Sequence, residues 1–167
     1  MTERLFLWLM RGLVSALSVG CSTAPKPLPS SAPERESKGV LSQDKRQDVV
    51  MQSMAMLDRN YTYGGKKLHT GFDCSGLVSF VYKQSAGVAL QGSAADMAKR
   101  TRPIDAQSAQ PGDLVFFNTL GTPNSHVGIY VGSGKFIHAA NERTGVRQER
   151  LDNSYWSKRF EGFRTLY

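Results

Sequence analysis

The stretch Gly71-Phe72-Asp73-Cys74-Ser75-Gly76 decides how the rest of this chain is interpreted. It opens an apolar segment, residues 77–82, and Gly87 follows, so the pattern predicts a helix of about two to three turns that begins at Cys74. Asp73 can cap this helix, because its carboxylate can accept hydrogen bonds from the free amides of the first turn. Cys74 would then lie at the positive end of the helix dipole, which favours the thiolate form of a nucleophile.

The composition is that of a globular protein. Of 167 residues, 40% are hydrophobic and 10% aromatic, so the chain can form one ordinary domain plus extensions. The formal net charge is +7, but the Lys and Arg residues are scattered and no stacking motif interleaves aromatics with them. We therefore expect no nucleic-acid partner. A basic surface that faces an anionic cell wall or membrane fits this charge, and so does a solvated surface without a partner.

The first twenty residues have the features of an export signal. Two arginines supply positive charge, and residues 12–20 form an apolar run that is too short to span a bilayer. The run ends in Leu17-Ser18-Val19-Gly20-Cys21, which resembles the lipobox of bacterial lipoproteins, where cleavage precedes a lipidated cysteine. We expect residues 1–20 to be removed before Cys21. Lipidation of Cys21 would hold the exported protein in the cell envelope, in the outer membrane and facing the periplasm.

A tether and one domain are expected after the signal. Residues 21–42 are rich in Pro and Ser and contain almost nothing large and apolar, which predicts a flexible tether. The domain is expected over residues 43–167. Its first helix is predicted with Arg46 among the solvent-facing polar residues and with a buried stripe at helical spacing. The stripe comprises Val49, Val50, Ser53, Met54 and Leu57. A short helix is also expected from Ser93 to about Arg100.

Short strand-like runs follow Pro103. They are separated by turns and lie at residues 114–117, 126–131, 136–140, 146–151 and 160–166. Helices followed by a run of strands indicate an α+β fold in which N-terminal helices pack on an antiparallel sheet. Between the second and third strands we expect a three-residue loop, Gly132-Ser133-Gly134, that pairs Val131 with Lys135.

Two of the three histidines, His126 and His138, lie in these adjacent strands. With the three-residue loop they share one face of the sheet as diagonal neighbours, with Cα atoms about 7–8 Å apart. A lone cysteine is more often an inert core residue, and so is one histidine in an apolar strand. Two histidines on one hairpin beside a helix-terminal Cys74 instead predict a nucleophile, a base and an orienting residue. His69, in a Gly/Lys-rich loop, is expected to be a surface residue.

A zinc site made by the same cysteine and two histidines is the competing interpretation. The sequence lacks the Cys-x-x-Cys and His-x-x-x-His spacings that are typical of such sites. We therefore expect neither a metal nor another cofactor.

Five segments contain the candidate residues and the turns around them. They are residues 61–65, 73–76, 111–117, 126–130 and 136–139. In this order they resemble the NlpC-type cysteine peptidases of the bacterial cell wall, which have a papain-like fold, over about residues 43–167. The resemblance implies that Cys74 is the nucleophile, His126 the general base and His138 the third, orienting residue. It also implies that the Tyr61 hydroxyl lies near the active site, where it would contact the oxyanion or the substrate.

The activity implied by this resemblance is that of a murein endopeptidase. Cys74 would attack amide bonds in peptidoglycan stem peptides or their cross-links, and water would release the acyl-enzyme. Two alternatives are a non-catalytic wall-binding module and a papain-like acyltransferase. We expect a monomer whose partners are the stem peptides and, through the lipid on Cys21, a membrane.

Overall fold

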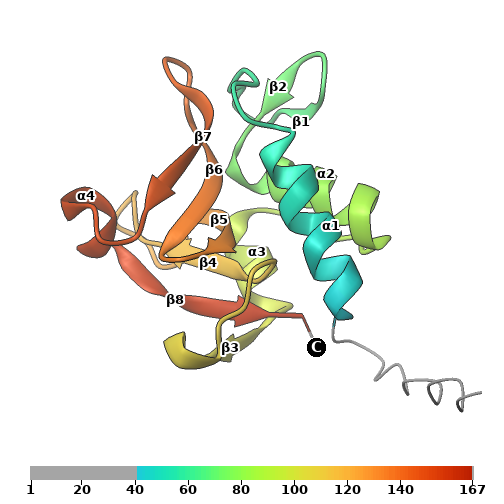
Figure 1. The fold of residues 1–167 in the computed structure, drawn as a ribbon. Coiled ribbons are helices and arrows are strands. Elements are labelled where there is room, and N and C mark those ends of the chain that lie inside the picture. The colour runs from blue at the N-terminus through green and yellow to red at the C-terminus, as the bar shows by residue number, and fades with distance from the viewer. Residues whose placement is uncertain (1–40, 167) are drawn as a thin grey trace, which may run out of the picture. The chain divides into compact units, whose positions relative to one another are not determined.

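The computed structural model describes residues 41–166. The predicted signal, Cys21 and the predicted tether as far as residue 40 lie outside these residues. The elements follow in this order (Figure 1): α1 (Gln43–Met54), β1 (Lys66–Lys67), β2 (Gly71–Phe72), α2 (Cys74–Ala86), α3 (Ala94–Lys99), β3 (Arg102–Ile104), the 3₁₀ turn η1 (Ala106–Ser108), β4 (Leu114–Phe117), β5 (His126–Gly132), β6 (Lys135–Asn141), β7 (Gly145–Arg150), α4 (Ser154–Ser157) and β8 (Phe160–Thr165). Among residues 41–166, no helix has the length and hydrophobicity needed to cross a membrane.

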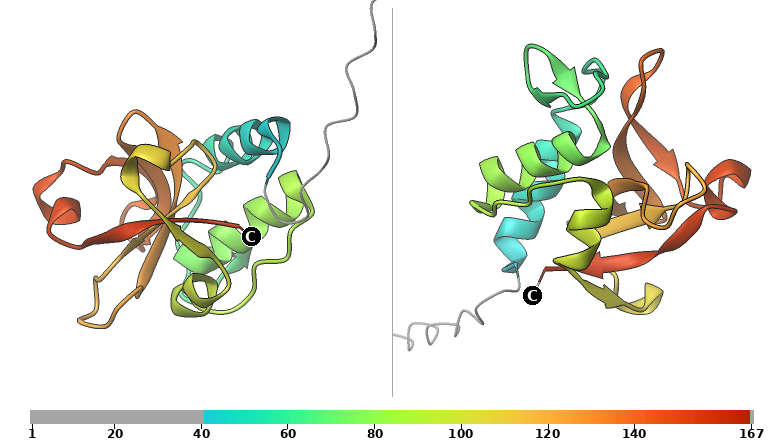
Figure 2. Two further views of the ribbon diagram at one scale, coloured as in Figure 1. Left: turned by 90° about the horizontal axis from the view of Figure 1, so that it is seen from below. Right: turned by 180° about the vertical axis from the view of Figure 1, so that it is seen from behind.

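The main sheet has six strands in the order β3-β8-β4-β5-β6-β7, and every neighbouring pair is antiparallel. Helices α1 and α2 cover one face of the sheet, and α4 lies on the other side (Figures 1 and 2). The predicted α+β fold, with N-terminal helices on an antiparallel sheet, is confirmed. The edge strand β3 was not predicted; it contains Pro103, a residue that is tolerated at sheet edges.

Strand β4 is buried on both faces, and its side chains divide the interior into two clusters. Leu114 and Phe116 belong to the cluster between the sheet and the helices. Val115 and Phe117 point the other way, into an aromatic cluster that includes Trp156. Because side chains alternate along a strand, one short apolar run supplies both layers.

Both ends of α2 lie where the sequence predicts them. The Asp73 side chain accepts a hydrogen bond of 2.6 Å from the Gly76 amide, and Gly87 ends the helix in the left-handed conformation. The close packing at the start of α2 requires glycine at position 76. A Cβ atom there would lie 1.9 Å from the carbonyl oxygen of Gly65, so only glycine lets the turn after Tyr61 pack against the start of the helix.

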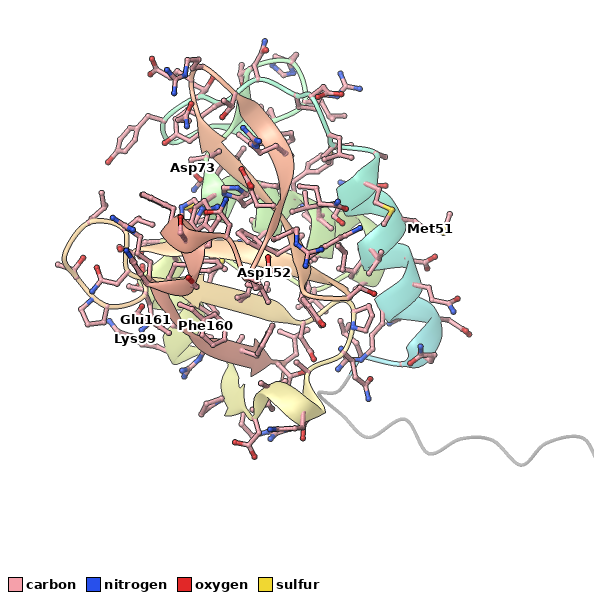
Figure 3. All side chains as sticks on the ribbon, turned by 60° about the vertical axis from the view of Figure 1, so that its left-hand side comes forward. Met51, Asp73, Lys99, Asp152, Phe160 and Glu161 are labelled. Carbon is pink, nitrogen blue, oxygen red and sulfur yellow. The ribbon has the colours of Figure 1, made fainter. Side chains whose placement is uncertain are left out.

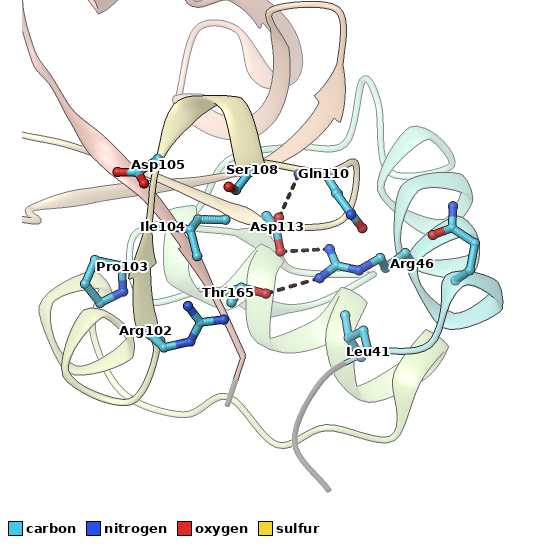
Figure 4. A pocket seen from close by; sticks show the side chains of 11 residues that line it. Leu41, Arg46, Arg102, Pro103, Ile104, Asp105, Ser108, Gln110, Asp113 and Thr165 are labelled. Carbon is cyan, nitrogen blue, oxygen red and sulfur yellow. Dashed lines mark hydrogen bonds and ion pairs between the residues drawn. The ribbon is translucent and has the colours of Figure 1, made fainter. Parts of the chain in front are cut away.

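Helix α1 corrects one prediction. Arg46 is buried rather than solvent-facing, and its guanidinium lies 2.8 Å from Asp113 and donates to Thr165 (Figure 4). Met54, predicted in the buried stripe, is exposed. Met51 is 69% exposed and lies on the outer side of α1 (Figure 3). A buried arginine is tolerated here because its charge is paired with that of a carboxylate 67 residues away, which helical periodicity cannot reveal.

The hairpin between β5 and β6 differs from the predicted one in its turn. The predicted pairing of Val131 with Lys135 is wrong, because Gly132 pairs with Lys135 across a two-residue turn. Both turn residues, Ser133 and Gly134, have positive φ, as tight hairpin turns require. A β-bulge between Tyr130 and Gly132 adds the residue that the shorter turn lacks. Beyond the bulge the register is the predicted one, so both histidines lie on the same face.

Candidate active site

Cys74 is the first residue of α2 and faces the start of β5. Its sulfur accepts a hydrogen bond from the backbone N–H of Val127, the second residue of that strand. This contact places the Cys74 sulfur against the backbone of the residue that follows His126. The structure therefore brings Cys74 to the start of the strand that carries His126, 52 positions further along the sequence (126 minus 74).

The two predicted histidines are in direct contact. Nε2 of His126 lies 2.8 Å from Nδ1 of His138, and the two rings are nearly perpendicular, at 83°. Both rings are buried. If Nε2 of His126 donates in this hydrogen bond, its Nδ1 has a free lone pair that can accept a proton. The contact can therefore set the tautomer that a general base needs.

Trp156, in the short helix α4, encloses this histidine pair. Its ring stacks on that of His126, with an interplanar angle of 27° and centroids 5.4 Å apart. With the His138 ring it forms a T-shaped contact, with an interplanar angle of 82° and centroids 4.7 Å apart. Phe136 completes the cluster around His138. These rings keep water away from the hydrogen bond between the histidines. Trp156 was not predicted as a site residue, because the local sequence offers only an aromatic pair, Tyr155-Trp156, within a polar turn.

Burial keeps the three groups neutral at pH 7. It raises the pKa of Cys74 to about 11, although the hydrogen bond from the Val127 amide acts in the opposite direction. It lowers the pKa of His126 to about 4 despite the nearby Asp73 carboxylate. Burial also lowers the pKa of His138, as do the charges of His126 and Arg147. The expected preference for a thiolate is therefore wrong for the resting site, because desolvation outweighs the helix terminus.

Tyr61 forms an isolated β-bridge with Phe72, two residues before Cys74. The pKa of its hydroxyl is raised, first by burial and then by the charges of Cys74 and Asp73, so it remains a proton donor. The Asp73 carboxylate accepts from the amides of both Gly64 and Gly76, and this ties the loop after Tyr61 to the start of α2. His69 lies in the turn between β1 and β2 and is exposed, as predicted.

The described part of the chain, residues 41–166, contains no group of three His, Cys, Asp or Glu side chains arranged to hold a metal ion.

The sequence and the fold of this chain are similar to those of known proteins. The model of the NlpC/P60 family matches residues 58–165, more than half of the chain. The chain belongs to the NlpC/P60 family.

Its relatives include proteins that are named as hydrolases. The chain is 37% identical over 116 residues to the murein DD-endopeptidase MepH of Escherichia coli, covering 68% of this chain and 43% of that protein. It is 38% identical over 117 residues to the gamma-DL-glutamyl hydrolase of Bacillus subtilis, covering 70% of this chain and 28% of that protein. A Staphylococcus aureus structure, described as similar to a lipoprotein of the NLP/P60 family, superposes with a TM-score of 0.66 at 32% identity and covers 75% of this chain and 42% of that one. The chain spans less than half the length of each.

Proposed function

We propose that this protein is a thiol-dependent peptidoglycan endopeptidase that hydrolyses amide bonds in stem peptides or their cross-links. The observation that carries the proposal is the hydrogen bond between His126 and His138 next to a cysteine at a helix N-terminus. The names of the two hydrolase relatives support amide bonds of bacterial wall polymers as the substrate class.

In the proposed mechanism, His126 acts as a general base. The site rests as a neutral thiol and a neutral imidazole, so the Cys74 proton moves to Nδ1 of His126 as the sulfur attacks the substrate carbonyl. His138 accepts the hydrogen bond from the imidazolium and stabilises it. The amides at the start of α2 and the Tyr61 hydroxyl would donate to the oxyanion.

The collapse of the tetrahedral intermediate breaks the amide bond. The leaving amine takes the proton from His126, and the acyl group remains on Cys74 as a thioester. A water molecule then gives a proton to His126 and attacks the thioester, and the return of that proton to the sulfur frees the carboxylic acid and restores the thiol.

We also propose the location that the N-terminal sequence suggests. Residues 1–20 would be cleaved as a lipoprotein signal, Cys21 would be lipidated, and residues 21–42 would tether a monomeric domain to the outer membrane, facing the periplasm. A Cys21→Ser variant should move from the membrane fraction to the soluble fraction; unchanged fractionation would contradict the anchor.

Mass spectrometry of purified muropeptides tests the activity. The wild type and Cys74→Ala are incubated separately with the same mixture. Shortened stems in the wild-type sample alone would support the hydrolase and identify the bond. Binding of the muropeptides with no cleavage would favour the wall-binding module. New amide or ester products in the presence of an amine or alcohol would favour the acyltransferase.

A further inference from the structure

A basic hollow lies between α2 and the β1–β2 region. It has a volume of about 620 Å³, and three exposed lysines line it: Lys66 and Lys67 of β1, and Lys83 in the last turn of α2. No Asp or Glu is among the lining residues within the described part of the chain. None of the three lysines takes part in an ion pair found within residues 41–166. The positive charge of the hollow is therefore not balanced by neighbouring carboxylates.

Two exposed apolar side chains lie on adjacent turns next to these lysines. Tyr63 is 87% exposed and follows Thr62, and Leu68 is 45% exposed and lies in the turn that ends at Thr70. The Thr62 hydroxyl donates a hydrogen bond to the Thr70 carbonyl, which ties the two turns together. The Thr70 amide donates to the Lys67 carbonyl and closes the turn that carries Leu68. The hydrogen bonds thus hold an apolar tip beside the basic hollow.

The combination of charges and apolar side chains indicates what covers this surface. Residues 59–72 contain three Lys or Arg and no Asp or Glu, so the segment attracts anions. Lysines bind phosphate groups as point charges. A soluble anion would use the lysines alone and leave Tyr63 and Leu68 in water. An anionic bilayer uses both, because tyrosine and leucine can enter the boundary between headgroups and acyl chains while the lysines stay among the phosphates.

We propose that this basic tip, formed by Tyr63, Lys66, Lys67, Leu68 and Lys83, docks on an anionic phospholipid membrane. Docking places α2 and the β1–β2 region against the bilayer and so fixes the orientation of the domain. The inference goes beyond the proposed peptidase and its proposed lipid anchor, because the contact needs neither the catalytic thiol nor an acyl chain. A basic surface of this kind adds a second, reversible membrane signal to a lipid anchor.

A fluorescent probe at the tip tests the contact. Cys21→Ser and Cys74→Ala remove both cysteines of the full chain, so Leu68→Cys supplies its single thiol. An environment-sensitive dye on that thiol should shift to shorter wavelength with vesicles that contain phosphatidylglycerol, and not with vesicles of phosphatidylcholine alone. The same dye at Leu120→Cys, an exposed leucine in the loop between β4 and β5, should not shift with either.

Two triple variants with equal loss of charge separate the tip from the net charge. Titration of the Leu68 dye with anionic vesicles gives a partition coefficient for each. It should fall by roughly tenfold or more when the lysines of the tip are replaced, since each lysine near an anionic bilayer contributes about fivefold. That variant is Lys66→Gln/Lys67→Gln/Lys83→Gln. Lysines on α1, on β6 and after α4 provide the control, which should stay within about twofold: Lys45→Gln/Lys135→Gln/Lys158→Gln.

Three results would overturn the proposal. One is a Leu68 dye that does not shift, or that shifts equally with anionic and neutral vesicles. Another is an equal loss of partitioning in the two triple variants, which would mean that only net charge matters. The third is a shift caused by murein sacculi and not by vesicles, which would assign the tip to a wall polymer. Because every protein in the experiment carries Cys74→Ala, its outcome is independent of the proposed peptidase activity.

Discussion

Nε2 of His126 lies 2.8 Å from Nδ1 of His138, so one hydrogen bond joins the first residue of β5 to the middle of β6. His126 can serve as a base only if it donates in this bond, because its Nδ1 is then free of a proton. His138 must then carry its own proton on Nε2. That atom is buried and has no hydrogen-bond partner among residues 41–166. A buried group without a partner is costly, so the catalytic tautomer depends on the aromatic rings that hold His138 in place.

The first prediction concerns His138 as a positioning residue. Replacing it with leucine removes the acceptor for His126 and should lower kcat by about 10²- to 10⁴-fold, in the range observed when the orienting member of a triad is disabled. His138→Asn keeps an acceptor and should retain more activity than the leucine variant. Steady-state kinetics with a stem peptide measure both. A leucine variant within threefold of the wild type would show that His138 does not orient the base.

The second prediction concerns the protonation state of Cys74. Because burial raises its pKa to about 11, the thiolate fraction should increase about tenfold for each pH unit between pH 6 and pH 9. The rate of alkylation by iodoacetamide should rise in parallel, and mass mapping identifies Cys74 as the site. A rate that stays constant from pH 5 to pH 8 would instead indicate a preformed thiolate–imidazolium pair.

The third prediction concerns stability against acid. The pKa of His126 is lowered in the folded protein to about 4, and that of His138 is lowered too, so between pH 6.5 and pH 4 the unfolded chain binds more protons than the folded one. The free energy of unfolding should be highest above pH 6.5 and fall as the pH decreases toward 4. Urea titrations at several pH values measure it. His126→Asn should flatten this dependence, and an equally steep fall in that variant would exclude His126 as its source.

The fourth prediction concerns Trp156. Trp156→Ala should destabilise the protein by about 3–5 kcal/mol, as large truncations of buried aromatics do. It should also admit water to the histidines, which would move their pKa values, and the acidic limb of the pH–rate profile, toward pH 6.5. Trp156→Phe should have smaller effects on both. A destabilised alanine variant with an unchanged pH profile would mean that Trp156 acts only in packing.

The fifth prediction concerns the buried ion pair of Arg46 and Asp113. Asp113→Asn leaves the guanidinium buried without a counter-charge and should cost about 3–5 kcal/mol of stability. The double variant Arg46→Met/Asp113→Leu removes both charges. Its loss of stability should be smaller than the sum of the losses in Arg46→Met alone and Asp113→Leu alone. Additive losses in denaturant unfolding would show that the two side chains do not interact.

The sequence predicts features whose causes are local. Both ends of α2 follow from residues that lie within the helix termini, Asp73 at the start and Gly87 at the end. The common face of His126 and His138 was predicted with the wrong turn, because the bulge before Gly132 compensates for the shorter loop. Two residues on paired strands share a face when the residue numbers of each pair sum to an even value, whatever the type of turn between the strands.

The features that the sequence does not predict depend on distant contacts. Arg46 looks like a surface residue until Asp113 is placed beside it. Strand β3 is short and lies at the sheet edge, so it has no buried alternation to detect. Trp156 becomes part of the site only when α4 packs over the histidine pair. The raised pKa of Cys74 is a consequence of the same burial.

Intact-protein mass spectrometry during turnover tests the central claim most directly. The wild type is mixed with a cleavable stem peptide and quenched in acid. The account predicts a covalent adduct with the mass of the acyl fragment, mapped to Cys74 and lost on treatment with hydroxylamine, together with the absence of cleavage and adduct in Cys74→Ala. Continued cleavage by metal-free Cys74→Ala, without any adduct, would contradict it.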